Sequence, residues 1–203
     1  MKVVVQQFLT LDGVLQGPGG PDEDRSGGFE HGGWLAPYGD DRFGEMIVEA
    51  LLEADAFLLG RKTYDIFAAF WPNVTDPDNP VAVALNTQPK YVVSTTLDTA
   101  AWNNTTLLKD DVTASLARLK REPGRELQVQ GSADLTQTLM REGLVDAYRL
   151  YVAPVVLGSG KRLFPEGTAP AAMELTDSEQ TSTGLVANVY ERAGKPAYGT
   201  IGE

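Results

Sequence analysis

The sequence predicts an α/β protein with a central mixed, mostly parallel sheet of about eight strands, flanked by helices, with an antiparallel edge at its C-terminal end. Helical patterns separate the early strand-like segments, as parallel crossover connections require. The last strand-like segments follow one another without a helix, which is typical of antiparallel pairing. No linker or internal repeat divides the 203 residues, so we expect one domain over residues 1–193 and a flexible tail over residues 194–203.

Composition is that of a folded soluble protein, with 42% hydrophobic and 22% charged residues. The net charge of −11 disfavours nucleic acid and anionic membranes as partners, so a local group of basic residues stands out. There is no cysteine, one histidine and no calcium-type acidic loop, and we therefore expect no metal site. No apolar run is long enough to span a membrane and the first residues do not resemble a signal peptide, so we expect a cytoplasmic protein.

The first predicted strand covers residues 2–11 and contains three consecutive valines, which is typical of a central strand buried on both faces. Asp12 begins an Asp-Gly turn signal that ends it. Residues 17–41 follow as a long segment rich in glycine, proline and acid, without periodicity. Because the segment carries large aromatic side chains and long loops are usually functional, we interpret it as a flap over a pocket, with a disordered insertion as the alternative.

A helix is predicted over residues 41–54, capped by Asp40 or Asp41. Its apolar side chains form one stripe, which consists of Phe43, Met46, Ile47, Ala50, Leu51 and Ala54. The acidic residues on the opposite side are Glu45, Glu49 and Glu53. Acids spaced four apart normally mark a solvated face of a helix.

A short apolar strand is predicted at residues 56–59, and it stops at Gly60. Helical spacing begins at Thr63, whereas residues 81–85 are too short to assign. The remaining predicted strands are residues 90–95, 105–108, 126–130, 147–156, 173–177 and 185–191. The further helices are one capped by Asp110 or Asp111 and one with Leu135 and Leu139 facing inward, which makes four in all.

Gly60 and Gly131 each end an apolar run directly before a helical pattern. The residues that follow them are Arg61, Lys62 and Thr63 in one case and Ser132 and Ala133 in the other. A helix start has unpaired N–H groups and partial positive charge, so it can bind a phosphate, and glycine lets the ligand approach the backbone. Because the carboxyl ends of parallel strands share one edge, the two junctions together favour an extended ligand such as a dinucleotide. Arg61 and Lys62 add charge that favours the 2′-phosphate of NADP.

Ser94 and Thr95, at the end of the strand predicted over residues 90–95, are in a position to bind a further phosphate. A simpler interpretation remains for the second junction, in which Gly131 serves only a tight turn and Ser132 only caps its helix. Neither the GxGxxG nor the P-loop pattern occurs in the chain.

Five segments together carry a family resemblance. In order they are TLDG at residues 10–13, LLGRKTY at 58–64, VVS at 92–94, VQGS at 129–132 and PVVLGSGK at 154–161. The ordered set resembles the dihydrofolate reductase-like superfamily. Within it, the chain is most similar to stand-alone proteins like the reductase domain of the bifunctional riboflavin biosynthesis deaminase–reductase. The cysteines of the deaminase half are absent.

The resemblance implies NADPH lying across the carboxyl edge of the sheet. The residues implied to contact it are Gly60, Arg61, Thr63, Ser94, Thr95, Gly131, Ser132, Ala133 and Leu135, and the basic pair above adds Lys62. It also places the segment from Asp12 beside the nicotinamide and implies a homodimer formed through residues 147–164.

Catalytic candidates are Asp12, Glu45 and His31. Glu45 lies near the place where a dihydrofolate reductase needs an acid, but its position among the spaced acids favours a solvated face. A turn role is favoured for Asp12, and simple exposure is favoured for the single loop histidine. The substrate-binding candidates are Asp12, Trp34, Phe43, Met46 and Phe67, although large aromatic side chains usually belong to the core.

These observations predict an NADPH-dependent reductase that passes a hydride to a small flat heterocycle or to a carbonyl or imine carbon, such as a pterin or a riboflavin precursor. The alternative is a module of the same fold that binds a nucleotide or metabolite without turnover. A structural homodimer with an empty pocket is a third possibility.

Overall fold

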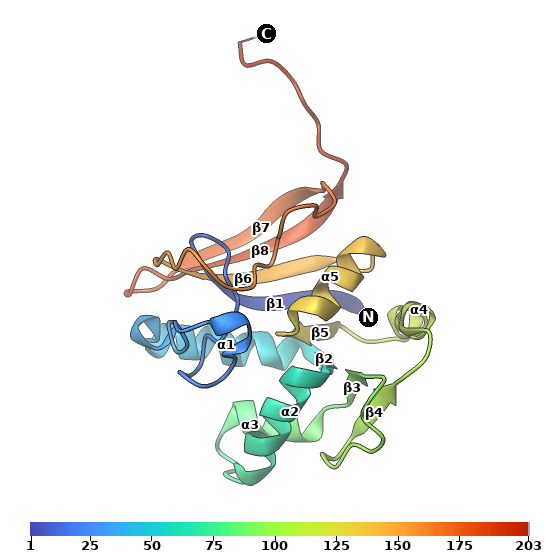
Figure 1. Ribbon diagram of the computed structural model, residues 1–203. Coiled ribbons are helices and arrows are strands. Elements are labelled where there is room, and N and C mark those ends of the chain that lie inside the picture. The colour runs from blue at the N-terminus through green and yellow to red at the C-terminus, as the bar shows by residue number, and fades with distance from the viewer. Residues whose placement is uncertain (203) are drawn as a thin grey trace.

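The computed structural model describes residues 1–202 as one eight-stranded mixed sheet flanked by helices, which confirms the predicted fold class (Figure 1). The strands are β1 (Lys2–Thr10), β2 (Ala54–Gly60), β3 (Lys90–Val93), β4 (Thr105–Leu108), β5 (Glu126–Gln130), β6 (Ala147–Ala153), β7 (Ala172–Gln180) and β8 (Val186–Gly194). Their order across the sheet is β4-β3-β2-β5-β1-β6-β8-β7. Pairing is parallel from β4 to β6 and antiparallel from β6 through β8 to β7.

In residues 1–202, five α-helices accompany the sheet, one more than the sequence predicts. They are α1 (Asp41–Glu53), α2 (Arg61–Phe70), α3 (Pro80–Thr87), α4 (Val112–Arg121) and α5 (Ala133–Arg141). Three short 3-10 helices are η1 (Ser26–Gly28), η2 (Ala36–Tyr38) and η3 (Trp71–Asn73). The unassigned residues 81–85 belong to α3, where Pro80 occupies the first turn and the Asn79 side chain caps the helix.

Several predicted boundaries are wrong by a few residues. α2 begins at Arg61, two residues before the expected Thr63, so the two cations are part of its first turn. β6 ends at Ala153 rather than at residue 156, because Pro154 has no N–H to continue the ladder. β3 ends at Val93, and both strands of the last hairpin are longer than predicted.

The helices divide between the two faces of the sheet. On one face, α4 and α5 pack against β1 and its neighbours, and the buried cluster includes Val3, Val5, Leu58, Leu116, Leu119, Val129 and Leu139. On the other face, α1, α2 and α3 pack in a cluster that includes Leu51, Phe57, Leu59, Tyr64 and Leu85. Successive strand residues alternate between these faces, so each central strand contributes to both cores.

The long segment after β1 is packed onto the fold, and the disordered alternative is wrong. Phe29, Trp34 and Leu35 are buried in a cluster with Met46 and Tyr151. The Trp34 indole Nε1 donates a hydrogen bond to a backbone carbonyl at 2.8 Å. The aromatic side chains therefore anchor the segment to the core of the protein.

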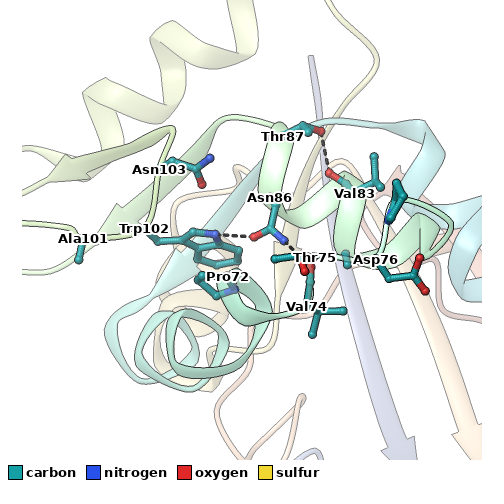
Figure 2. Close-up of a pocket in the computed structure, with 12 residues that line it drawn as sticks. Pro72, Val74, Thr75, Asp76, Val83, Asn86, Thr87, Ala101, Trp102 and Asn103 are labelled. Atoms are coloured by element: carbon teal, nitrogen blue, oxygen red, sulfur yellow. Dashed lines mark hydrogen bonds between the residues drawn. The ribbon is translucent and has the colours of Figure 1, made fainter.

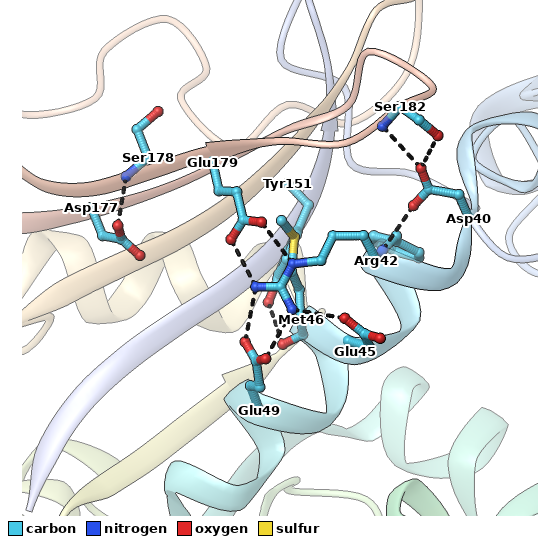
Figure 3. A network of polar contacts seen from close by, with 11 residues as sticks. Asp40, Arg42, Glu45, Met46, Glu49, Tyr151, Asp177, Ser178, Glu179 and Ser182 are labelled. Carbon is cyan, nitrogen blue, oxygen red and sulfur yellow. Dashed lines mark hydrogen bonds and ion pairs between the residues drawn. The ribbon is translucent and has the colours of Figure 1, made fainter.

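The N-terminus of α1 is fastened to the hairpin of β7 and β8 (Figure 3). Asp40 caps α1 through the backbone N–H of Phe43 and accepts the hydroxyl of Ser182 at 2.6 Å. Arg42 forms ion pairs with Glu49 at 2.9 Å and with Glu179 of β7 at 2.6 Å. Arg42 thus pairs with the acidic side of its own helix and joins that helix to β7 at the edge of the sheet.

A cavity of about 480 Å³ lies beside α3 (Figure 2). The Asn86 side chain donates to the Trp71 carbonyl at 2.9 Å and accepts from the Trp102 indole at 2.9 Å. Nearby, Lys90 is fully buried, donates to the carbonyls of Leu85 and Gln88 at the end of α3, and lies 4.5 Å from the centre of the Trp102 ring. These contacts fix α3 to the segment before β4.

Beyond β8, the chain leaves the sheet and extends away from the fold (Figure 1). Gly194, which was expected in the tail, is the last residue of β8. Within residues 1–202, no helix is long and apolar enough to cross a membrane.

Candidate functional site

A cavity of about 540 Å³ opens at the carboxyl edge of the sheet, where β1, β2 and β5 end. Residues 15–18, at the start of the long segment, and residues 23–25 within it form one side of the cavity, and the first turns of α2 and α5 form the other. The flap interpretation is therefore half right, because this part of the segment lines the cavity while its aromatic side chains lie in the core. A wider hollow of about 840 Å³ at the opposite edge is lined by side chains that are already ion-paired, such as Lys2 with Glu191.

The two strand–glycine–helix junctions touch each other directly in the wall of this cavity. The Gly60 N–H donates to Ser132 Oγ at 2.7 Å, and the hydroxyl oxygens of Ser132 and Thr63 are 2.9 Å apart. Gly131 and Ser132 both have positive φ, at 57° and 64°. A Cβ on Gly131 would meet Thr63 Oγ1 at 2.9 Å, so glycine is required there by backbone conformation and by close approach.

The helix-cap interpretation of Ser132 is wrong. Its backbone is left-handed and its side chain makes no cap hydrogen bond to α5, because the hydroxyl is turned toward β2. The hydroxyl instead joins the two junctions.

The helices that begin at the cavity differ from the others at their N-termini. Side chains of Asp40, Asn79 and Asp111 cap α1, α3 and α4. Neither α2 nor α5 has a side-chain cap, and their first residues line the cavity. Within residues 1–202, the only α-helices without such a cap are thus the two whose first residues line the cavity. Two uncapped helix starts side by side suit an anion with more than one phosphate.

Charged side chains of both signs surround the opening. Arg61 Nε pairs with Asp65 at 2.7 Å, and Lys62 is exposed beside it. Lys161 Nζ pairs with Asp24 at 2.5 Å, which ties the turn after β6 to the long segment. Burial would raise the pKa of Asp24, but hydrogen bonds from Lys161 and Ser26 hold that pKa at about 2.

Some wall residues were not predicted as site residues from the sequence. They are Gln6, Gln7, Phe8, Gln16, Gln130 and Lys161, with Glu23, Asp24, Arg25 and Asp134 near the opening. The three wall glutamines that belong to β1 and β5, which are Gln6, Gln7 and Gln130, are buried. Polar residues within an apolar strand run are the signal that was available in the sequence, but only the strand register shows that they meet.

The structure brings together most of the predicted cofactor residues. Those that line the cavity are Gly60, Arg61, Lys62, Thr63, Gly131, Ser132, Ala133 and Leu135, together with the substrate candidate Phe67. Ser94 and Thr95 do not line it. The Ser94 hydroxyl accepts the N–H groups of Thr96 and Leu97 at 3.2 and 3.0 Å and so closes its own turn.

Asp12 lies outside the cavity and holds two turns together. Its carboxylate accepts the Thr10 hydroxyl at 2.6 Å and the Gly158 N–H at 2.8 Å, and it pairs with Arg162 at 3.1 Å. The hydrogen bond from Thr10 is the main reason that the pKa of Asp12 lies at about 2. This geometry favours the turn role over catalysis.

The remaining candidates also lie outside the cavity lining. Glu45 is exposed and pairs with Arg42 at 3.1 Å, and His31 is exposed on the long segment. Trp34 and Met46 are buried in the core, and Phe43 packs against Phe8 and Tyr151 there. No group of three or more metal-ligating side chains occurs in the part of the chain that the structure describes.

Comparison with known proteins agrees with this architecture. The family model described as the RibD C-terminal domain matches residues 1–187. Two uncharacterised proteins of Bacillus subtilis strain 168 are similar: YyaP, 29% identical over 95% of this chain and 96% of its own, and YwjB, 27% identical over 88% and 91%.

Solved structures show the same fold. A putative riboflavin biosynthesis protein from Shewanella has a TM-score of 0.69 at 22% identity, covering 95% of this chain and 99% of its own. A pyrimidine reductase-like protein from Corynebacterium diphtheriae has a TM-score of 0.60 at 12% identity, covering 94% and 91%. A diaminohydroxyphosphoribosylaminopyrimidine deaminase/5-amino-6-(5-phosphoribosylamino)uracil reductase from Thermotoga maritima has a TM-score of 0.61 at 12% identity, and this chain spans 56% of it.

Proposed function

Because the chain belongs to the RibD C-terminal domain family, we propose that it is an NADPH-dependent reductase of a small flat heterocycle. The observation that carries the proposal is the joined pair of uncapped helix starts at one cavity. Their N–H groups would hold the diphosphate, and Gly60 and Gly131 let the two helix starts approach each other closely, because a Cβ on either would meet a side chain of the other junction. Bound NADPH would supply the hydride.

The basic residues at the start of α2 would read the 2′-phosphate. Asp65 uses only Nε of Arg61, and within residues 1–202 the two terminal nitrogens of that guanidinium form no hydrogen bond. Those nitrogens can therefore form charge-assisted bonds to a phosphate. Lys62, exposed on the same turn, adds a second positive charge.

The other half of the cavity suits a flat ring. Phe8 and Phe67 supply apolar surface, and the amides of Gln6 and Gln130 supply polar groups. The names of the structural relatives include a pyrimidine reductase-like protein and a uracil reductase, which agree with a heterocyclic substrate such as a pterin or a riboflavin precursor. The long segment, held by Lys161 and Asp24, would exclude water from the ring during reduction.

The direct test is calorimetric titration of the purified protein with NADPH, followed by measurement of NADPH oxidation with a panel of pterins and pyrimidines. We expect one binding site per chain and oxidation with at least one ring class. A Ser94→Ala protein is a matched control, since that hydroxyl closes its own turn and should leave NADPH affinity unchanged. Absence of NADPH binding would refute the proposed function.

Arg61→Ala tests the preference for the phosphorylated cofactor. We expect NADPH affinity to fall about tenfold, the equivalent of one charge-assisted contact, while NADH affinity changes little. Because the substitution also removes the Asp65 ion pair, Asp65→Ala is measured as the control. Equal losses of affinity for NADPH and NADH would show that Arg61 does not bind the 2′-phosphate.

The second candidate function is ligand binding without turnover. It is favoured by the placement of Asp12, Glu45 and His31, none of which lines the cavity. Tight NADPH binding with no oxidation across the panel would favour this alternative. A proton from solvent or from a cavity side chain would be needed for the reductase.

A further inference from the structure

A second cavity, of about 380 Å³, lies between the C-terminal end of α5 and the strands β6, β8 and β7. Most of its wall is apolar and comes from Met140 of α5, Met173 of β7, Phe164 and residues 169–171 of the loop before β7. It shares no wall residue with the cavity at the carboxyl edge of the sheet. The proposed function therefore gives this second cavity no role.

Tyr148 and Arg192 line this cavity with polar groups. Tyr148 pairs with Tyr190 in the register of β6 and β8, and Arg192 pairs with Met173 in the register of β8 and β7. Because paired residues and residues two apart share one face of a sheet, Tyr148, Arg192 and Met173 lie on the same face. That face carries α5, whose Met140 packs in the same cluster as Tyr148.

The Tyr148 hydroxyl is a hydrogen-bond donor without a protein partner. Tyr148 is only 5% exposed, and its ring packs against that of Phe164 with 5.6 Å between the ring centroids. The hydroxyl forms no hydrogen bond within residues 1–202, yet the only enclosed side-chain polar atom there without a partner belongs to Gln6. The hydroxyl is thus not enclosed, and it opens onto the cavity that Tyr148 lines. Burial raises the pKa of Tyr148 to about 12, against the opposing effect of the nearby Arg192 charge, so the phenol keeps its proton at neutral pH.

Arg192 is the only charged side chain in the wall of the cavity. Its Nη1 donates to the Gly143 carbonyl at 3.1 Å, just beyond the end of α5. Within residues 1–202, Arg192 forms no ion pair, and its other guanidinium nitrogens form no hydrogen bond. The hydroxyl of Thr168, a further polar group of the wall, is already donated to the Pro165 carbonyl at 2.7 Å. The free donors of the cavity are therefore the phenol and the guanidinium.

We propose that this cavity binds a small aromatic carboxylate, whose oxygens accept hydrogen bonds from the Tyr148 hydroxyl and the Arg192 guanidinium. A guanidinium presents its donors in a planar fork that matches a carboxylate. The ring of the ligand packs against Phe164 and against the thioethers of Met140 and Met173, which are favourable neighbours for an aromatic ring. The volume of about 380 Å³ lies at the small end of the range for ligand sites and suits a single ring.

The test uses two probes of nearly equal shape, benzoate and nitrobenzene, of which only benzoate is charged. Ligand-observed NMR titrations with the full chain measure both affinities. The wild-type protein should bind benzoate about tenfold more tightly, the value of one hydrogen bond between charged groups. The Arg192→Met protein should lose this preference. The matched Arg141→Met protein should keep it, because Arg141 also lies at the C-terminal end of α5 but does not line the cavity.

Three results would overturn the proposal. They are a wild-type protein without a preference for benzoate, a preference that survives in Arg192→Met, and a preference that is lost in Arg141→Met. The first result is the one expected if an apolar side chain of a second copy of the chain fills the cavity instead.

The Tyr148→Phe protein distinguishes ligand binding from a structural role of the hydroxyl. Benzoate affinity should fall about fivefold, the value of one hydrogen bond, while nitrobenzene affinity stays the same. The melting temperature of the ligand-free protein should not change, because the hydroxyl has no protein partner. Unchanged benzoate affinity, or a clear decrease in the melting temperature, would mean that the hydroxyl does not serve a ligand and would overturn the proposal.

Discussion

At the scale of single residues, Ser132 is the most constrained position of the site. It is one of three non-glycine residues with positive φ within residues 1–202, beside Asn104 and Asp111. A left-handed serine costs backbone energy, and such strain is often stored where function needs it. Here the strained conformation directs the hydroxyl to Gly60 and Thr63. The strain thus holds two helix starts at a fixed separation.

A double-mutant cycle of Ser132→Ala and Thr63→Ala measures this link. Thr63→Ala should lower the free energy of unfolding by about 1 kcal/mol, since it removes one partly buried hydrogen bond. Ser132→Ala should lower it more, because the Ser132 hydroxyl takes part in three such bonds. The double change should cost less than the sum, because both changes break the same contact. Urea denaturation gives the three values. Strict additivity would show that the two hydroxyls are not coupled.

Lys90 is buried and forms no ion pair within residues 1–202, so the stability of the protein depends on pH in the alkaline range. Burial lowers its pKa from 10.5 to about 8. Between these values the unfolded chain holds a proton that the folded chain has released, so stability rises with pH. Relative to Lys90→Met, the wild type should gain up to about 3 kcal/mol from pH 8 to 10.5 in urea denaturation. A constant difference between the two proteins across that range would contradict the lowered pKa.

At the scale of elements, the sequence predicts well what periodicity determines. The apolar stripe of α1 and the valines of β1 need no tertiary information, and both elements are where the sequence places them. The boundaries of other elements depend on capping and on neighbours. α3 has a Pro at its first turn and an Asn cap, which together define a helix too short for its apolar pattern to reveal.

The site illustrates the same limit. The Gly60 and Gly131 junctions were identified because a glycine between an apolar run and a helical pattern is a local signal. The contact of Ser132 with Gly60 joins residues that are 72 positions apart, and no local pattern predicts it. Gln6 is not identifiable as a wall residue from the sequence, because only the strand register brings it beside Gln130 at the cavity.

Asp12 connects the turn after β1 to the turn after β6, and the Asp12→Asn substitution tests how much this connection stabilises the protein. The change should lower the free energy of unfolding at neutral pH by about 1–3 kcal/mol, the value of hydrogen bonds to a charged acceptor. The folded pKa of about 2 lies below the ordinary value of 3.8, so this stabilisation is present above pH 3.8 and is lost as pH falls toward 2. Denaturation curves of both proteins should therefore converge in acid. A difference that stays constant down to pH 2 would rule out the carboxylate as its source.

At the scale of the whole molecule, the placement of β6 restricts how two copies can associate. β6 pairs with β1 on one side and β8 on the other, so it has no free edge. The edge strands of the sheet are β4 and β7, and β7, which lies at the end nearer β6, carries Glu174, Asp177 and Glu179. Two such edges would place like charges together, which disfavours edge-to-edge pairing.

We propose instead that the homodimer expected through residues 147–164 forms face to face. Val156 and Phe164 are exposed apolar residues in this stretch, at 65% and 47%. Phe164→Glu should convert the dimer to a monomer in sedimentation equilibrium, because it would bury a charge at the interface. Tyr198→Glu in the exposed C-terminal extension is the control and should leave the dimer intact. A wild-type protein with the mass of a single chain would disprove the dimer.

The position of β1 in the middle of the sheet has a consequence for folding. Both partners of β1 lie late in the chain, β5 from residue 126 and β6 from residue 147. During synthesis, a strand with three consecutive valines has no native neighbour until more than half of the chain has been made. Such distant pairing also slows folding, because a large loop must close before the contacts form. The cavity, which requires β1, β2 and β5 together, is thus completed only after this late closure.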